Sequence, residues 1–143
     1  MLTLRTPFYA SSPQPLNPPD LKSITSLNPL LGHVSAICAA SFFHLFDESG
    51  QHQIAQKFAS LISPLPGSTI FGAHRGSPVK GMIRRTPIGD QPSQRFCHSP
   101  DSWKELWDGE VFEKGTVRVE ADIFTVDLGT EKAHWMRWCV TRL

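Results

Sequence analysis

Two short apolar runs on either side of an amphipathic segment most limit what this 143-residue chain can fold into. Residues 34–40 are small or β-branched, which is typical of a strand covered on both faces, and residues 68–73 have the same character. Between the runs, apolar residues recur at helical spacing from Ile54 to Ile62, and Asp47 can cap the helix. The pattern predicts a strand–helix–strand unit with parallel strands, and therefore an α/β fold.

The second half of the chain predicts a further helix and a hairpin. Ser99 followed by Pro100 is typical of a helix start, and the expected buried face of that helix carries Trp103, Leu106 and Trp107. Residues 117–128 and 134–142 form two apolar segments joined by a short polar link, which predicts an antiparallel hairpin.

Two details of this half are also predicted. The alternation of apolar residues changes phase at Ile123–Phe124, which indicates a β-bulge in the first of the two strands. Residues 75–98 contain several glycines and prolines and the Arg84–Arg85 pair, so we expect a long loop that covers a site.

The first thirty residues differ from the rest in composition. Their prolines remove backbone donors and fix φ, which excludes a long helix or a central strand. We therefore expect an irregular segment at residues 1–30, with one helical turn at 20–24, followed by one α/β domain at residues 31–143. The prolines are Pro7, Pro13, Pro15, Pro18, Pro19 and Pro29.

The composition excludes several classes of protein. A net charge of +1, from 14 basic and 13 acidic residues, gives no electrostatic reason to expect nucleic acid or an anionic membrane as a partner. The sequence shows neither a membrane-spanning run nor a secretory signal, so we expect a cytoplasmic protein. The three cysteines, Cys38, Cys97 and Cys139, have no CxxC spacing, so we expect reduced thiols and no metal site.

Four motifs, in this order, resemble the C-terminal half of fungal class I S-adenosylmethionine-dependent methyltransferases from terpenoid and polyketide gene clusters. They are LNPLLGHVSAICAASFFHLFDESGQ, SPLPGSTIFGAHRG, FCHSPDSWKELWDGEVFEKGTVRVEA and WCVTR. The resemblance covers residues 26–143. It implies a partial Rossmann-like α/β sheet that holds strands four to seven of that fold, with the last strand between the fifth and the sixth.

The resemblance also implies S-adenosyl-L-methionine as the cofactor. In the family, a glycine-rich turn after the first strand holds the methionine end of the cofactor. No GxGxxG pattern occurs in this sequence, so the half that carries the cofactor loop is expected to be missing and the protein to be truncated.

By the resemblance, Ser41, Phe42 and Phe43 match the wall that faces the cofactor, where a phenyl ring can contact the sulfonium. His44 can act as general base for a hydroxyl acceptor, whereas a carboxylate acceptor needs no base. The alternatives are that the phenylalanines fill the core and that His44 caps a turn.

The resemblance places further residues beside the substrate. His74 and Arg75 match positions that border it, and Arg75 can pair with a substrate carboxylate or be a solvated loop charge. The remaining candidates would line a hydrophobic pocket, or pack in the core in the case of the tryptophan. They are Met82, Phe96, His98 and Trp103.

Three functional hypotheses follow. The first is a truncated, inactive remnant of a methyltransferase that O-methylates a carboxyl or hydroxyl group on a hydrophobic intermediate. The second is a binding or assembly protein, in which a second copy, another chain or the N-terminal segment Leu2–Tyr9 covers the exposed sheet edge and the pocket binds a hydrophobic metabolite. The third is an enzyme, either a methyltransferase or a cofactor-independent catalyst that uses the hydrophobic pocket.

Overall fold

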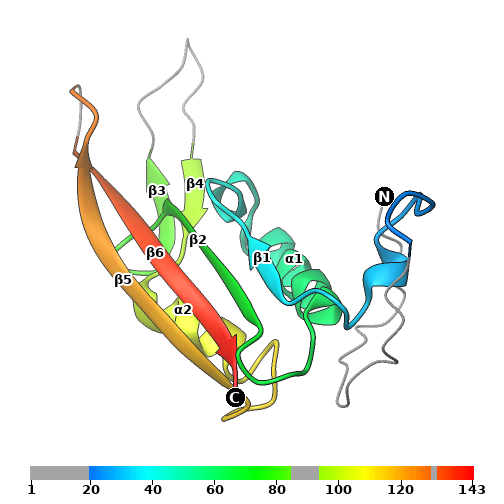
Figure 1. Ribbon diagram of the computed structural model, residues 1–143. Coiled ribbons are helices and arrows are strands. Elements are labelled where there is room, and N and C mark those ends of the chain that lie inside the picture. Colours follow the sequence, from blue (N-terminus) through cyan, green and yellow to red (C-terminus); the bar gives the residue numbers. More distant parts are fainter. Residues whose placement is uncertain (1–19, 85–93, 130–131) are drawn as a thin grey trace.

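The computed structural model describes residues 20–84, 94–129 and 132–143, which form a mixed sheet flanked by two helices (Figure 1). The sheet has four strands in the order β1-β2-β6-β5, and β1 and β5 form its edges. Only β1 and β2 are parallel; the other neighbours are antiparallel. The strands are β1 (Ala36–Cys38), β2 (Thr69–Arg75), β5 (Val117–Asp127) and β6 (Lys132–Arg142).

The strand–helix–strand unit predicted from the sequence is confirmed. Helix α1 (Glu48–Leu61) connects β1 to β2, and the Asp47 carboxylate caps it by accepting a hydrogen bond from the Gly50 N–H at 2.7 Å. Asp47 therefore satisfies one of the free amide groups of the first turn. A 3-10 turn, η2 (Phe43–Leu45), lies between β1 and α1 and was not expected.

The second predicted helix and the hairpin are also present. Helix α2 (Pro100–Trp107) begins after Ser99, whose hydroxyl accepts a hydrogen bond from the Ser102 N–H in a capping box. Strands β5 and β6 pair along their whole length. The position of the last strand, between β2 and β5, is the one that the sequence analysis expected.

The expected bulge is wrong. Pairing of β5 with β6 runs without interruption from Val117–Arg142 to Asp127–Lys132. Ile123 packs against the core, whereas Phe124 lies on the opposite face, where the Arg137 guanidinium sits 5.9 Å from its ring centroid. The change of phase therefore reflects a strand with apolar residues on both faces and a regular backbone.

The expected long loop at residues 75–98 is also wrong in part, because it contains a second, two-stranded sheet. Strands β3 (Gly81–Arg84) and β4 (Gln94–Cys97) pair antiparallel, with Met82 opposite Phe96. Each has four residues, which is too short for an alternating pattern to stand out beside the surrounding glycines and prolines.

The N-terminal expectations fall largely outside the described residues, which begin at Asp20. The helical turn expected at residues 20–24 is a single hydrogen-bonded turn from Asp20 to Ser23, and a 3-10 helix, η1 (Asn28–Leu30), follows it. The η1 turn continues through Gly32 and His33 toward β1.

The core lies on one face of the four-stranded sheet. Ala55 and Ala59 of α1, and Trp103 and Trp107 of α2, belong to one buried cluster with Trp138 of β6. On the opposite face the side chains are exposed, which differs from the covering on both faces expected for the first apolar run. Exposed residues of that face are Ala36, Cys38, Phe71, Glu120, Asp122 and Arg137.

No helix in the described ranges is long and apolar enough to cross a membrane.

Gly72 marks a close approach between β1 and β2. A Cβ atom at residue 72 would lie 2.3 Å from the Ala39 carbonyl oxygen and 3.1 Å from Cζ2 of Trp138. The carbonyl belongs to the backbone that pairs the two strands, so it cannot move without loosening that pairing.

We therefore expect Gly72→Ala to lower the free energy of unfolding by about 3 kcal/mol, since overpacking forces the backbone apart. Urea unfolding followed by circular dichroism measures the change. Gly67→Ala is the matched control: no atom lies within 4 Å of its added Cβ, although φ is +87°. Gly67→Ala should lower the free energy of unfolding by only about 1 kcal/mol, because its backbone lies in the left-handed region. Equal losses of stability in the two variants would contradict the steric explanation for Gly72.

Candidate functional site

The chain leaves β1 through a backbone conformation that is uncommon for a residue with a side chain. Ser41 has φ of +52°, and its N–H donates to the Ala73 carbonyl at 2.7 Å, which extends the β1–β2 pairing beyond β1. The left-handed region is unfavourable for serine relative to glycine. This turn exposes Ser41 and leaves Phe42 half-buried, and the two residues after Phe42, Phe43 and His44, are buried.

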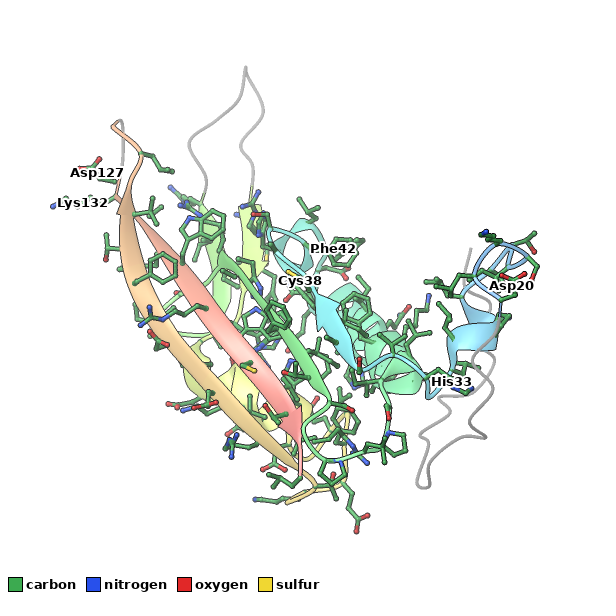
Figure 2. The ribbon with its side chains drawn as sticks, in the orientation of Figure 1. Asp20, His33, Cys38, Phe42, Asp127 and Lys132 are labelled. Atoms are coloured by element: carbon green, nitrogen blue, oxygen red, sulfur yellow. The ribbon has the colours of Figure 1, made fainter. Side chains whose placement is uncertain are left out.

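Phe42 and Phe43 differ sharply in burial. Phe43 is fully buried and its ring packs edge-on against Phe58, Trp103 and Trp138, with centroid distances of 5.0–5.6 Å. Phe42 is half-buried and stacks on Phe58 at 6.0 Å (Figure 2 labels it at the end of β1). Of the expected cofactor wall, the structure leaves Ser41 and Phe42 accessible and uses Phe43 in the core.

His44 lies against the end of β2. Its Nδ1 accepts a hydrogen bond from the Arg75 backbone N–H at 3.2 Å, and its ring is 6.0 Å from that of Trp135. An Nδ1 that accepts places the proton of a neutral imidazole on Nε2, so in this arrangement Nε2 is a donor. The general-base role predicted for His44 requires the other tautomer.

His74 is buried at the centre of the sheet. Its Nδ1 accepts a hydrogen bond from the Trp138 Nε1–H at 2.9 Å, and its ring packs edge-on against Trp103 at 4.9 Å. Burial, and to a smaller extent the nearby His44 and His98, lowers the pKa of His74 from 6.5 to about 3. His74 is therefore neutral at physiological pH.

His98 is buried at the start of α2. Its Nδ1 lies 2.9 Å from the Ser102 hydroxyl, and its ring is 5.3 Å from that of Trp103. Burial, and to a smaller extent the nearby Lys80, lowers the pKa of His98 from 6.5 to about 4, and Glu48 acts in the opposite direction. His74, His98 and Trp103 thus form one buried group of aromatic rings behind the accessible residues.

Met82 and Phe96 lie side by side across the β3–β4 pair and line two adjoining hollows. The smaller hollow, about 220 Å³, also includes His44 and Arg95. The larger, about 660 Å³, includes the acidic side chains Asp47, Glu48 and Glu110.

The structure thus separates the predicted substrate residues into two groups. Met82 and Phe96 line the smaller hollow together with the general-base candidate His44, although Phe96 and His44 are themselves only 7% and 8% exposed. The other predicted substrate residues line neither hollow: Arg75 is half-buried, and the remaining three are nearly or fully buried, namely His74, His98 and Trp103. Sequence reasoning missed Gln94 and Arg95, which line the smaller hollow, because a segment interpreted as loop offered no pattern to single them out.

Few of these residues could bind a metal ion or a cofactor. Within residues 20–84, 94–129 and 132–143, no group of three or more histidine, cysteine, aspartate or glutamate side chains could hold a metal ion. Ser41 and Phe42 offer a hydroxyl and an aromatic edge to a cofactor. The first turn of α1 carries Glu48 and that of α2 carries Asp101, so neither helix start in the described part favours an anion.

Comparison with known proteins gives one informative similarity. The chain is 35% identical over 85 residues to the O-methyltransferase phiE of Fungal sp. (strain ATCC 74256), and the match takes in 59% of this chain. It takes in 27% of the relative, so the chain spans about a quarter of that protein's length. No family model matches the sequence.

Two of the buried histidines, His74 and His98, predict loss of stability in acid. Each is neutral when folded, with a pKa of about 3 or 4, and binds a proton near pH 6.5 when unfolded. Their contribution is present above pH 6.5 and is lost as pH falls toward the folded values. Between about pH 7 and pH 5, we expect each to lower the free energy of unfolding by about 2 kcal/mol.

Urea unfolding at the two pH values tests this expectation. His98→Gln should remove about half of the combined histidine contribution, whereas His134→Gln, at an exposed position of β6, should leave the pH dependence unchanged. The same pH dependence in His98→Gln and the unsubstituted protein would argue against a buried neutral His98.

Proposed function

We propose that this chain forms the acceptor-side part of an S-adenosylmethionine-dependent O-methyltransferase of fungal secondary metabolism. The observation that carries the proposal is the 35% identity over 85 residues to a fungal O-methyltransferase. The proposed acceptor is a carboxyl or hydroxyl group on a hydrophobic terpenoid or polyketide intermediate.

The geometry at the ends of β1 and β2 supports this proposal. Ser41 and Phe42 follow β1, Arg75 ends β2, and His44 joins the two through its hydrogen bond to the Arg75 N–H. In parallel α/β sheets, ligands bind at the carboxyl ends of neighbouring strands. The exposed Ser41, the half-buried Phe42 and Arg75 and the buried His44 therefore gather where a small molecule would be expected.

Each residue has a role in the proposed site. S-adenosylmethionine, when bound, would supply an electrophilic methyl group on its sulfonium. Ser41 and Phe42 would form the wall beside that group, and Met82 and Phe96 would contact the apolar body of the acceptor. His44, with its proton on Nε2, would donate a hydrogen bond to an acceptor oxygen.

This arrangement favours a carboxylate over a hydroxyl acceptor. A carboxylate is already ionised at neutral pH and needs only to be positioned, whereas a hydroxyl must lose its proton to a base. His44 could serve as that base only after giving up the hydrogen bond from Arg75. The proposed reaction is therefore esterification of a hydrophobic acid.

A methyl-transfer assay tests the proposal directly. The chain is incubated with methyl-labelled S-adenosylmethionine and paired hydrophobic acids and alcohols, and calorimetry measures cofactor binding separately. We expect saturable heat and labelled methyl ester, with transfer to acids faster than to alcohols. If His44 only positions the acceptor, His44→Ala should lower the rate of methyl transfer by about tenfold. If His44 acts as the base, the loss should be about 100-fold.

His134→Gln is the control, because that residue is exposed in β6 and lines none of the hollows described above. Absence of both heat and labelled product, with cofactor up to millimolar concentration, would reject activity of the chain by itself.

A second candidate function is a binding or assembly role, and the position of β1 at the edge of the sheet formed by the described residues favours it. Ala36, Cys38 and Ala40 are exposed along that strand and its extension, and the apolar run 34–40 carries no charge or proline. Natural sheet edges are usually protected by such residues, because an open strand pairs with other chains. We propose that a second copy or another chain covers this edge.

Light scattering after size exclusion tests this role. We expect a mass above the 15.9 kDa of one chain, and Ala36→Lys should shift it toward the monomer by placing a charge at the edge. Glu120→Lys, at an exposed position of β5 on the opposite edge of the sheet, is the control. A monomeric unsubstituted protein over a wide range of concentrations would contradict the proposal.

A further inference from the structure

The smaller hollow at the base of the β3–β4 pair has a fixed frame. It lies where η2, the start of α1 and the two short strands meet. The buried Gln51 side chain donates hydrogen bonds from Nε2 to the Phe46 carbonyl at 3.0 Å and to the Phe96 carbonyl at 3.3 Å. One side chain therefore holds together the two segments that flank the hollow, so its shape is set before any ligand binds.

The walls of the hollow are apolar and accessible. Leu45, Phe46 and Met82 line it and are among the large hydrophobic side chains that remain exposed, at 62%, 37% and 59% of their surface. Phe96 completes the wall from β4. A ligand that covers these side chains removes apolar surface from water, which is the main source of affinity in such sites.

The polar groups that line the hollow are mostly donors. Arg95 contributes a guanidinium and Gln94 an amide, while His44 carries its proton on Nε2 in the tautomer set by the Arg75 N–H. The one carboxylate among the lining residues, Asp47, accepts the Gly50 N–H as the cap of α1. An anion with several lone pairs matches such a set, and a carboxylate matches the fork of an arginine.

We propose that this hollow binds the carboxylate end of an amphipathic organic acid, with Arg95 as the residue that recognises the carboxylate. Leu45, Phe46, Met82 and Phe96 contact the apolar part of the acid. Asp47 lines both hollows, whereas Arg95 lines only the smaller one and Glu110 only the larger one, so the smaller hollow is the more favourable of the two for a carboxylate. Binding of the acid does not depend on the proposed function; only its consequence, methylation of the bound acid, rests on that function.

Binding is measured without S-adenosylmethionine, by calorimetry with 1-naphthylacetate and with the neutral 2-(1-naphthyl)ethanol. The unsubstituted chain should bind the acid more tightly than the alcohol. Arg95→Met keeps the length of the side chain and removes the charge, and should weaken acid binding by about tenfold or more with little effect on the alcohol. Arg95→Lys should lose less, because it keeps the charge without the fork.

Arg118→Met, at an exposed position of β5, is the control and should bind both probes as the unsubstituted chain does. Equal loss of both probes in Arg95→Met, or an unchanged affinity for the acid, would overturn the inference.

The ¹³C signals of the methionine ε-methyl groups give a second measurement that needs no variant at Arg95. On addition of 1-naphthylacetate, the Met82 signal should shift, whereas that of Met136, which is fully buried in the core, should not. An unshifted Met82 signal at saturating probe would overturn the inference. Binding of the acid without methyl transfer would reject the proposed function alone, and transfer to alcohols without acid binding would reject this inference alone.

Discussion

Packing of the Phe43 side chain joins the parts of this structure. Its ring is fully buried and contacts aromatic rings from α1, α2, β2 and β6, among them Phe58, Trp103, His74 and Trp138. Because Phe43 belongs to the segment that follows β1, the same contacts fix the positions of Ser41, Phe42 and His44. The core therefore determines the geometry of the part of the candidate site that follows β1, whereas Met82, Arg95 and Phe96 come from the β3–β4 pair.

Two of the polar groups packed against this core, His74 and His98, are neutral histidines. His74 accepts from the Trp138 indole and is surrounded by rings, so a positive charge there would be poorly solvated. The same burial removes His74 and His98 from proton transfer near neutral pH. Acid–base chemistry at this site thus depends on His44 or on an acceptor that needs no base, and the second agrees with the donors that surround the smaller hollow.

The two faces of the sheet differ, and this difference affects which surfaces a partner chain could bind. Both helices pack on one face of the sheet, and the other face carries exposed charged and aromatic side chains. The edge formed by β1 is short, uncharged and exposed. An enzyme fragment that binds an acid and an assembly protein that pairs through its edge use different surfaces, so the two proposals do not exclude each other.

The sequence by itself determined the elements with strong local signals. The Asp47 cap with the apolar stripe of α1, the Ser99–Pro100 start of α2 and the β5–β6 hairpin could be predicted, because capping and periodicity act within a few residues. The strand order followed from the family resemblance, and so did the choice of Phe42 and His44 as candidate site residues.

Only the tertiary structure decided the rest, because it depends on contacts between distant residues. The β3–β4 pair consists of strands too short for a visible pattern and forms by pairing across residues 85–93, which lie outside the described part. The bulge was predicted wrongly because apolar residues on both faces of β5 look, in sequence, like a change of register. Arg95 joined the candidate site because Gln51 of α1 holds β4 beside η2, and no local pattern encodes that contact.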